Sequence, residues 1–374
     1  MPSSIYLRPL ACAPAPVTPA EPGEAMSLSH GLPLTNSGLH FYALEVAVRR
    51  SPRDASRITM GVAEFFGRDW PGTVKAAGIL EHLTTARPRL AGLDLARPRI
   101  MGIVNVTPDS FSDGGQHDDA ARAIAHGLKL AHEGADILDI GGESTRPSAA
   151  YVPVEEELRR VIPVIEGLRS KTGKLISIDT RKAEVMRQAA AAGADILNDV
   201  SALTHDPAAL DAAATTGLPV ILMHPGNADP KTMNDKPHYD DLVLDVYDYL
   251  DERIAACEAA GIPRAKLCVD PGIGFGKHLH HNVAMMAGLS ILHGLGVPIL
   301  LGASRKKMIG ELCDVPEAKD RVPGSLACAL AGAAQGAQIL RVHDVAATKQ
   351  ALAVWLASTY GSEVAAKGAM QCWN

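Results

Sequence analysis

One pattern recurs along most of this chain and limits the folds open to it: a short apolar run of strand length that ends in polar, turn-forming residues. The first example is IMGIVNVTPDSFSDGG, residues 100–115, in which the apolar run ends at Asn105 and a glycine-ended loop follows. Seven more segments keep this order: ADILDIGGESTRP, LISIDTRK, DILNDVS, PVILMHPG, LCVDPGIGFGK, PILLGASRKK and QILRVHD. Each is typical of a buried strand that delivers a polar loop.

Helical patterns lie between and after these strands. Their ranges are 118–133, 154–171, 183–192, 207–216, 239–260, 282–295, 319–335 and 344–360. Eight strand–helix units in one direction imply parallel strands joined by right-handed crossovers. The sequence therefore predicts an α/β fold, a (β/α)8 TIM barrel with its active site at the carboxyl ends of the strands. A doubly wound open sheet is the alternative, but it is seldom built from eight such uniform units.

The chain divides into three parts on this interpretation. Residues 1–97 form an N-terminal extension of unknown role, which opens with a Pro/Ala-rich stretch and continues with a strand pattern, FYALEVAVRR, and an amphipathic helix pattern, GTVKAAGILEHLTTA. We expect it to pack on or beside the main domain. Residues 98–362 form the barrel and residues 363–374 a C-terminal tail.

Amino-acid composition limits the binding partners and the cellular compartment that we expect. The net charge of -6 gives no basic surface for nucleic acid and no polybasic face for a membrane, so a small-molecule partner is expected. None of the six cysteines forms a C-x-x-C pair, and most lie in apolar segments, which favours core thiols in a reducing compartment. The N-terminus lacks the pattern of a signal peptide, and no apolar run reaches about 18 residues, which indicates a cytoplasmic protein.

Polar residues stand at or just past the ends of all eight predicted strands. They are Asn105, Asp139, Asp179, Asn198, His224, Asp270, Ser304, Arg305, Lys306, Arg341 and His343. In a barrel these ends converge on one mouth, which would gather the set into one pocket. Alternatively, single members cap neighbouring helices or pair with one another, and for Asp139 we favour a role in holding the mouth together.

Seven motifs in this order resemble those of the dihydropteroate synthases: NVTPDSFSDGG, DIGGESTRP, SIDTRK, LNDVS, VDPGIGFGK, GASRKKMIG and LRVHDV. The likeness runs from about Arg99 to about Thr359 and leaves the extension outside. It implies the (β/α)8 fold, a homodimer and Mg2+. The implied reaction joins 7,8-dihydropterin-6-ylmethyl diphosphate to 4-aminobenzoate in folate biosynthesis, with release of diphosphate and inhibition by sulfonamides.

The resemblance also implies which residues bind the substrates. The set is Thr145, Asp179, Asn198, Met223, Asp270, Phe275, Gly302, Ser304, Lys306 and Arg341. A carboxylate can accept both adjacent N–H donors of the pterin's 2-amino-4-oxo edge, so Asp270 and Asp179 are the candidates for that edge. Met223 and Phe275 would be apolar walls. We interpret the glycines at 272, 274 and 276 as a tight turn rather than a phosphate-binding loop.

By the same resemblance, the catalytic set is Asn105, Arg146, Lys306, Arg341 and His343. Asn105 matches the Mg2+ ligand, and diphosphate oxygens and water would supply the other ligands. Arg146 with Thr145, and Arg341 with His343, match anion-binding positions. Because an arylamine is neutral at pH 7, we infer a dissociative substitution that depends on positioning and electrostatics.

Two polar loops are predicted to close over the site and build the aminobenzoate pocket. They are NVTPDSFSDGG, with Asp109 and Phe111, and GESTRPSAA, with Pro147. A third loop, MHPGNADPKTM, is one residue longer than the family pattern, which puts the role of Gly226 in doubt. Lys307 stands where serine is frequent and is expected to lie outside the pocket.

Other interpretations remain open. The histidines at 278, 280 and 281 invite a metal site, but they lack H-E-x-x-H order and precede a helix, which argues against one. A pterin-dependent methyltransferase would share the barrel and the pterin-binding residues but would not need the TPDSFSDGG and STRP loops. A catalytically silent pterin-binding homologue should have lost Asn105, Arg146 or Arg341, and all three are present.

Overall fold

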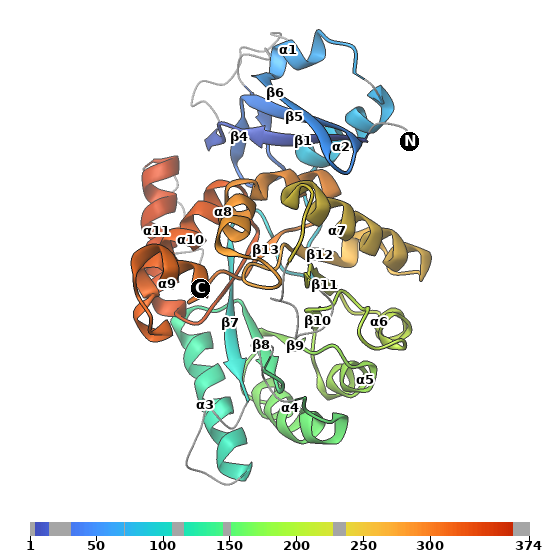
Figure 1. Cartoon of the computed structure of the whole chain (residues 1–374). Coiled ribbons are helices and arrows are strands. Elements are labelled where there is room, and N and C mark those ends of the chain that lie inside the picture. Colours follow the sequence, from blue (N-terminus) through green and yellow to red (C-terminus); the bar gives the residue numbers. More distant parts are fainter. Residues whose placement is uncertain are drawn as a thin grey trace.

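Eight parallel strands form the centre of the molecule, which we describe from a computed structural model covering residues 4–14, 31–70, 72–106, 116–144, 151–226 and 237–361 (Figure 1). The strands are β7 (Arg99–Asn105), β8 (Ile137–Gly141), β9 (Leu175–Asp179), β10 (Ile196–Asp199), β11 (Val220–Met223), β12 (Leu267–Asp270), β13 (Leu300–Leu301) and β14 (Ile339–Val342). They pair in the order β12-β11-β10-β9-β8-β7-β14-β13. A parallel bridge between Val269 and Ile299 joins the two edges. The predicted barrel is confirmed.

Helices connect the strands and cover the outside of the barrel. They are α3 (Gln116–Glu133), α4 (Val154–Arg169), α5 (Ala183–Ala192), α6 (Ala209–Thr216), α7 (Leu242–Ala259), α8 (Leu279–Ala287), α9 (Lys307–Cys313), α10 (Val322–Ala334) and α11 (Val345–Tyr360), with 3-10 turns η3 (Arg264–Lys266), η4 (Leu289–Leu295) and η5 (Ala318–Asp320). The single helix expected over 282–295 is wrong, because α8 ends before Gly288 and the chain continues as η4. The short α9 was not anticipated. Among the described residues, no helix is both long and apolar enough to cross a membrane.

The inside of the barrel has an apolar layer and a polar layer. At the amino end, a cluster of buried side chains contains Met101, Ile137, Ile196, Ile221, Cys268, Leu300 and Ile339. Leu90 and Leu95, from the segment before β7, belong to the same cluster and close this end of the barrel. Because every second residue of a strand faces the same side, the positions two residues further along face inward as well. Those positions include Asp139, Asn198 and Arg341, so the polar layer lies towards the carboxyl ends.

The extension folds into two small antiparallel sheets with two helices. One sheet has the order β1 (Ser4–Leu10), β5 (Ala43–Ser51), β6 (Asp54–Gly61), the other the order β2 (Ala13–Pro14), β4 (Leu39–Phe41), β3 (Leu32–Pro33), and the helices are α1 (Val62–Phe66) and α2 (Thr73–Thr84). The expected strand and helix correspond to β5 and α2. A separate cluster of buried side chains, including Leu7, Phe41 and Leu44, forms its core.

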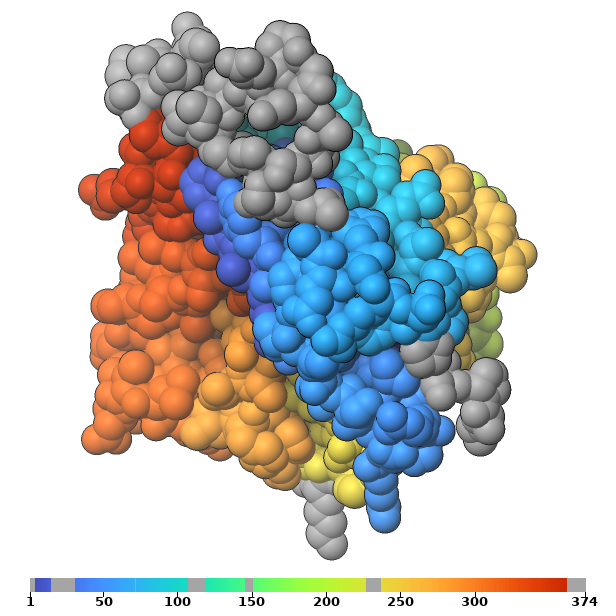
Figure 2. Space-filling model, turned by 90° about the horizontal axis from the view of Figure 1, so that it is seen from above, coloured from blue at the N-terminus to red at the C-terminus, as the bar shows by residue number. Residues whose placement is uncertain are grey.

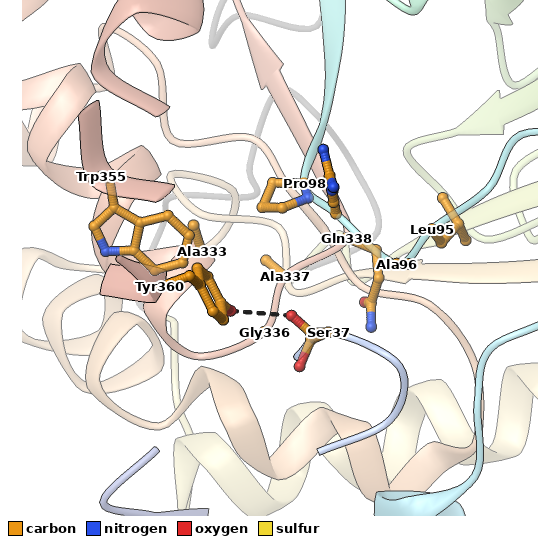
Figure 3. A pocket seen from close by; sticks show the side chains of 11 residues that line it. Ser37, Leu95, Ala96, Pro98, Ala333, Gly336, Ala337, Gln338, Trp355 and Tyr360 are labelled. Carbon is orange, nitrogen blue, oxygen red and sulfur yellow. Dashed lines mark hydrogen bonds between the residues drawn. The ribbon is translucent and has the colours of Figure 1, made fainter. Parts of the chain in front are cut away.

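The extension packs on the outside of the barrel, between the C-terminal helices and α7 (Figure 2). Ser290 donates a hydrogen bond to the carbonyl oxygen of Pro9 (2.9 Å), and Tyr360 donates to that of Ser37 (3.0 Å). Figure 3 shows a small crevice at this junction, with Trp355 and Tyr360 on one side. Its other lining residues include Pro98, which precedes β7, so the crevice lies towards the amino end of the barrel, away from the polar layer.

Candidate active site

Arg341 is the centre of the polar layer. Its Nε donates to Oδ2 of Asp139 (2.6 Å) and its Nη2 donates to Oδ2 of Asp179 (2.8 Å). The Asn198 amide adds a longer hydrogen bond to Oδ2 of Asp139 (3.2 Å). These side chains come from β14, β8, β9 and β10, which the barrel order brings together. Asp139 thus ties three strands together, in agreement with the structural role expected for it.

In this cluster, burial and the neighbouring charges shift the pKa values in opposite directions. Burial alone would lower the pKa of Arg341, but Asp139 and Asp179 outweigh it and the pKa is raised, so the guanidinium stays charged. Burial raises the pKa of Asp179 above its usual range, although Arg341 counteracts this. A buried ion pair of this kind contributes little net stability, whereas losing one partner is costly. The cluster is therefore preorganised at an energetic cost, which is typical of functional sites.

Asp270 lies at the end of β12, next to the glycine-rich turn. Its Oδ1 accepts the backbone N–H of Gly272 (2.7 Å), and the residue is 7% exposed. A Cβ on Gly272 would lie 2.1 Å from the carbonyl oxygen of His224, and the residue has a φ of +68°, so only glycine fits there. A Cβ on Gly302 would lie 3.5 Å from Oδ2 of Asp270, at van der Waals distance, so Gly302 borders the carboxylate. Burial raises the pKa of Asp270.

The glycine turn is held from inside by Lys277. Its Nζ lies 2.9 Å from Nδ1 of His224 and donates to the carbonyl oxygens of Gly272 (3.0 Å) and Phe275 (3.1 Å). Burial lowers the pKa of Lys277 to about 7. Burial, followed by the Lys277 charge, lowers the pKa of His224 well below its usual range, so His224 is a neutral acceptor. The tight turn inferred from the glycine spacing is confirmed by positive φ values at 272, 274 and 276.

Phe275 and Lys306 face each other at the mouth. Nζ of Lys306 lies 4.1 Å from the centroid of the Phe275 ring, within the range of a cation–π contact. The buried Met223 lies beside the glycine turn that carries Phe275, since its Cγ would lie 3.4 Å from a Cβ on Gly272. An aromatic plane beside a cation suits a flat heterocycle with ring oxygen and nitrogen acceptors.

The ends of β13 and β14 meet through Ser304 and His343. Oγ of Ser304 lies 3.0 Å from Nδ1 of His343 and accepts its backbone N–H (3.2 Å). Burial, reinforced by Arg341, lowers the pKa of His343 to about 3, so His343 adds no charge to an anion site in the free protein. Arg305 has a different role, because it forms a two-point ion pair with Asp344 (2.9 and 2.5 Å).

Asn105 ends β7 beside Asp179. Its Oδ1 would lie 3.8 Å from a Cβ on Gly141, and Oδ2 of Asp179 would lie 3.9 Å from the same point. Two hard oxygen atoms therefore border the same small space beside Gly141, and the one from Asp179 also accepts the hydrogen bond from Arg341. This arrangement fits a Mg2+ ion that takes a few protein oxygens and completes its shell from other molecules.

The remaining predicted residues lie outside the described part of the chain. They are Asp109, Phe111, Thr145, Arg146 and Pro147. Glu143, just before the second loop, is described and had not been singled out. It pairs with Arg181 (3.1 Å) and Lys182 (2.9 Å) and accepts the backbone N–H of Val152 (3.2 Å). Its carboxylate therefore joins both stems of the segment 145–150 to the end of β9.

The two positions at which the sequence departs from the family pattern have a physical explanation in the structure. Gly226 has a φ of +75°, and a Cβ there would lie 2.6 Å from Cα of Gly276, so its role is close packing against the glycine turn. Lys307 pairs with Glu311 (2.8 Å) and its side chain is 86% exposed, as expected.

His278 and His281 cap the start of α8 reciprocally. Of the cysteines described, Cys313 is exposed, contrary to the expectation of core thiols, whereas Cys257 and Cys268 are buried.

Comparison with known proteins identifies the family. Residues 101–343 match the family model described as pterin binding enzyme. The chain is similar to the dihydropteroate synthase of Escherichia coli (strain K12), with 53% identity over 262 residues, which are 70% of this chain and 92% of that protein.

Solved structures give the same result. A Xanthomonas albilineans dihydropteroate synthase with 4-aminobenzoic acid is 58% identical, with a TM-score of 0.69, over 73% of this chain and 98% of that one. The same protein in complex with 7,8-dihydropteroate is 55% identical, with a TM-score of 0.66 and the same coverage. These names favour the synthase over a pterin-dependent methyltransferase or a silent homologue. The extension lies outside the family match.

Proposed function

Because the chain belongs to the pterin binding enzymes, and among them to the dihydropteroate synthases, we propose that the polar layer at the carboxyl ends of the strands is where it makes 7,8-dihydropteroate. The substrates are 7,8-dihydropterin-6-ylmethyl diphosphate and 4-aminobenzoate, and the products are 7,8-dihydropteroate and diphosphate. The reaction belongs to folate biosynthesis, and sulfonamides are expected to inhibit it.

The observation that carries this proposal is the buried carboxylate of Asp270 beside the Phe275–Lys306 pair. A pterin whose 2-amino-pyrimidine edge bonds to Asp270 would have its ring between Met223 and Phe275, with Lys306 within reach of its ring oxygen or nitrogen. Asn198 and Asp179 would extend the polar contacts. A buried site built for these donors discriminates strongly against rings that lack them.

The chemistry follows from charge. The bond between the pterin methylene carbon and the diphosphate oxygen breaks, the diphosphate leaves with the bonding electrons, and the amine nitrogen forms the new bond before losing a proton. Lys306 supplies positive charge near the departing group, together with Arg341, whose charge is shared with Asp139 and Asp179 in the free protein, and neutral His343 supplies a hydrogen bond. These groups act by fixed electrostatics and positioning.

Mg2+ would be held by Asn105, with Asp179 close by, and would neutralise charge on the diphosphate when bound. By the same resemblance we propose a homodimer in the cytoplasm. The arginine and threonine of the second loop, Arg146 and Thr145, are proposed to bind the diphosphate, and Asp109, Phe111 and Pro147 to enclose the aminobenzoate.

The direct test is to incubate the purified protein with the pterin diphosphate, 4-aminobenzoate and Mg2+, and to look for dihydropteroate by mass spectrometry. We expect the product to form with Mg2+ and to fall sharply with a chelator. Asn105→Ala should raise the Mg2+ concentration needed for half-maximal rate. If the product forms equally with and without Mg2+, the metal assignment fails while the synthase assignment stands.

A further inference from the structure

Arginines of the extension contact the start of α7, which follows the loop at the carboxyl end of β11. Three carboxylates lie within residues 240–245. The pairs are Arg53 with Asp240 (2.8 Å), Arg57 with Asp241 and Arg49 with Asp245 (2.6 Å). All three arginines belong to β5, β6 and their connecting turn. In Figure 1 this sheet lies against the barrel on the side of α7 and α8.

The same carboxylates shape the first turn of α7. Oδ2 of Asp245 accepts the backbone N–H groups of Asp240 (3.0 Å) and Asp241 (3.2 Å), while its Oδ1 accepts from Arg49. Oδ1 of Asp241 accepts the backbone N–H of Leu244 (3.4 Å), while its Oδ2 binds Arg57. Two carboxylates therefore each hold the helix start with one oxygen and the extension with the other.

Tyr239 connects this turn to the candidate site, because it directly precedes the first of these carboxylates. Its hydroxyl donates to the carbonyl oxygen of Gly276 (2.8 Å), and its ring centroid lies 6.1 Å from that of His224. Gly276 stands between Phe275 and Lys277 in the glycine turn. A shift of the helix start would thus be transmitted by one hydrogen bond to the turn that carries the aromatic wall.

We propose that the extension is a positioning element for the pterin site: Arg49, Arg53 and Arg57 fix the start of α7 and, through Tyr239, fix the glycine turn of residues 272–277. This inference rests on the proposed role of that turn in binding pterin. The family match begins at residue 101, so the arginines are additions to what the family shares. Packing on η4 and α11 already attaches the extension to the barrel, whereas the arginines contact the start of α7, which follows the tyrosine that bonds to the turn.

The test compares steady-state kinetics and pterin affinity of Arg57→Ala with the wild-type enzyme. Arg50→Ala is the matched control, because Arg50 pairs with Asp54 inside the same hairpin and its side chain is 55% exposed. We expect Arg57→Ala to raise the KM for the pterin substrate about two- to fivefold with little change in kcat, since the loss of one partly exposed ion pair sets the upper limit of the effect. Arg57→Lys should restore most of the affinity, and Arg50→Ala should match the wild type.

A double-mutant cycle with Tyr239→Phe tests the route. If the effect passes through the tyrosine hydroxyl, Arg57→Ala combined with Tyr239→Phe loses no more affinity than Tyr239→Phe alone. Additive losses would show that the effect does not pass through Tyr239.

An unchanged pterin KM in Arg57→Ala, even with a lowered melting temperature, would show a merely structural contact and overturn the proposal. Should Arg57→Ala fail to fold, Arg53→Ala gives the same test, because its side chain is 80% exposed. If the wild type binds no pterin, the site assignment fails instead.

Discussion

The two ends of the barrel are built from the same strands, but the amino end is apolar and the carboxyl end contains buried charges. On β8, Ile137 belongs to the apolar layer and Asp139 to the polar one, and both are fully buried. On β14 the corresponding pair is Ile339 and Arg341. At the amino end, side chains gain stability by leaving water, at about 25 cal/mol per Å2 of apolar surface. At the carboxyl end, charges have been taken out of water and must be paired.

The difference indicates that the carboxyl end meets a demand other than stability. An apolar set of similar volume would stabilise the carboxyl end at least as well as the Arg341 cluster does. The amino end is instead filled by the apolar cluster described above and is closed by Leu90 and Leu95. We therefore expect substitutions at the amino end to affect unfolding alone, and substitutions in the polar layer to affect ligand binding.

The largest effect is expected from Arg341→Met. It leaves Asp139 and Asp179 buried without their cation, so the free energy of unfolding should fall by about 3–5 kcal/mol. Denaturant unfolding at pH 7 measures this. Adding Asp139→Asn to the variant should recover part of the loss, because one uncompensated charge is removed. A loss no larger in the single variant than in the double variant would mean that the charges are not the cause.

Ile137→Ala, at the amino end, should cost about 3 kcal/mol of unfolding free energy, because it leaves a cavity in a fully packed layer. Its pterin affinity should equal that of the wild type, as measured by calorimetry under folding conditions. Weakened pterin binding in this variant would contradict the separation between the two ends.

Asp270→Asn should show the opposite behaviour: weaker pterin binding with no loss of unfolding free energy. The loss of a charge-assisted hydrogen bond should weaken pterin binding by about 1.5–3 kcal/mol. Because burial raises the pKa of Asp270, its charged form disfavours folding once the pH exceeds the unfolded value, so the amide should not lower the unfolding free energy at pH 7. Calorimetry and denaturant unfolding on the same sample provide both numbers, and unchanged pterin affinity would remove this assignment.

Lys277→Met should change the unfolding free energy by a smaller amount, which depends on pH. The pKa of Lys277 is lowered to about 7 by burial, so between pH 7 and its ordinary value the unfolded chain binds a proton that the folded chain does not. Wild-type stability therefore gains from rising pH in this window, and the variant lacks that gain. The unfolding free energy of the variant relative to the wild type should fall by about 1–2 kcal/mol from pH 6.5 to pH 9. A constant difference across this range would show that Lys277 stays charged.

Much of the fold was predictable because it depends on periodic local signals. The eight apolar runs and their polar ends define the barrel and its mouth, and the glycine spacing predicted the turn at 272–277. The break between α8 and η4 was missed because a continuous apolar pattern does not distinguish an α-helix from a 3-10 turn. Strands β1 and β6 were missed because Pro9 and the charged residues of 53–57 obscure their alternation.

The site was only partly predictable, because pairing inside it depends on contacts between distant strands. The sequence placed Arg341 and Asp179 at one mouth, but it gave no reason for Arg341 to bond Asp179 and Asp139 in the free protein. Lys277 with His224, and Tyr239 with Gly276, were missed for the same reason. A lysine that directly follows a glycine-rich turn was the one available signal, and its burial could not be inferred from the sequence.

The central claim is that the polar layer binds the pterin, and a crystal structure of the protein with a pterin bound tests it most directly. The predicted result is a ring beside Phe275 and Met223 whose 2-amino and adjacent ring nitrogens lie about 2.7–3.2 Å from the Asp270 carboxylate. Lys306 should lie within hydrogen-bond distance of a ring oxygen or nitrogen. A pterin bound at the amino end, or in the crevice beside Trp355, with Asp270 untouched, would contradict the account.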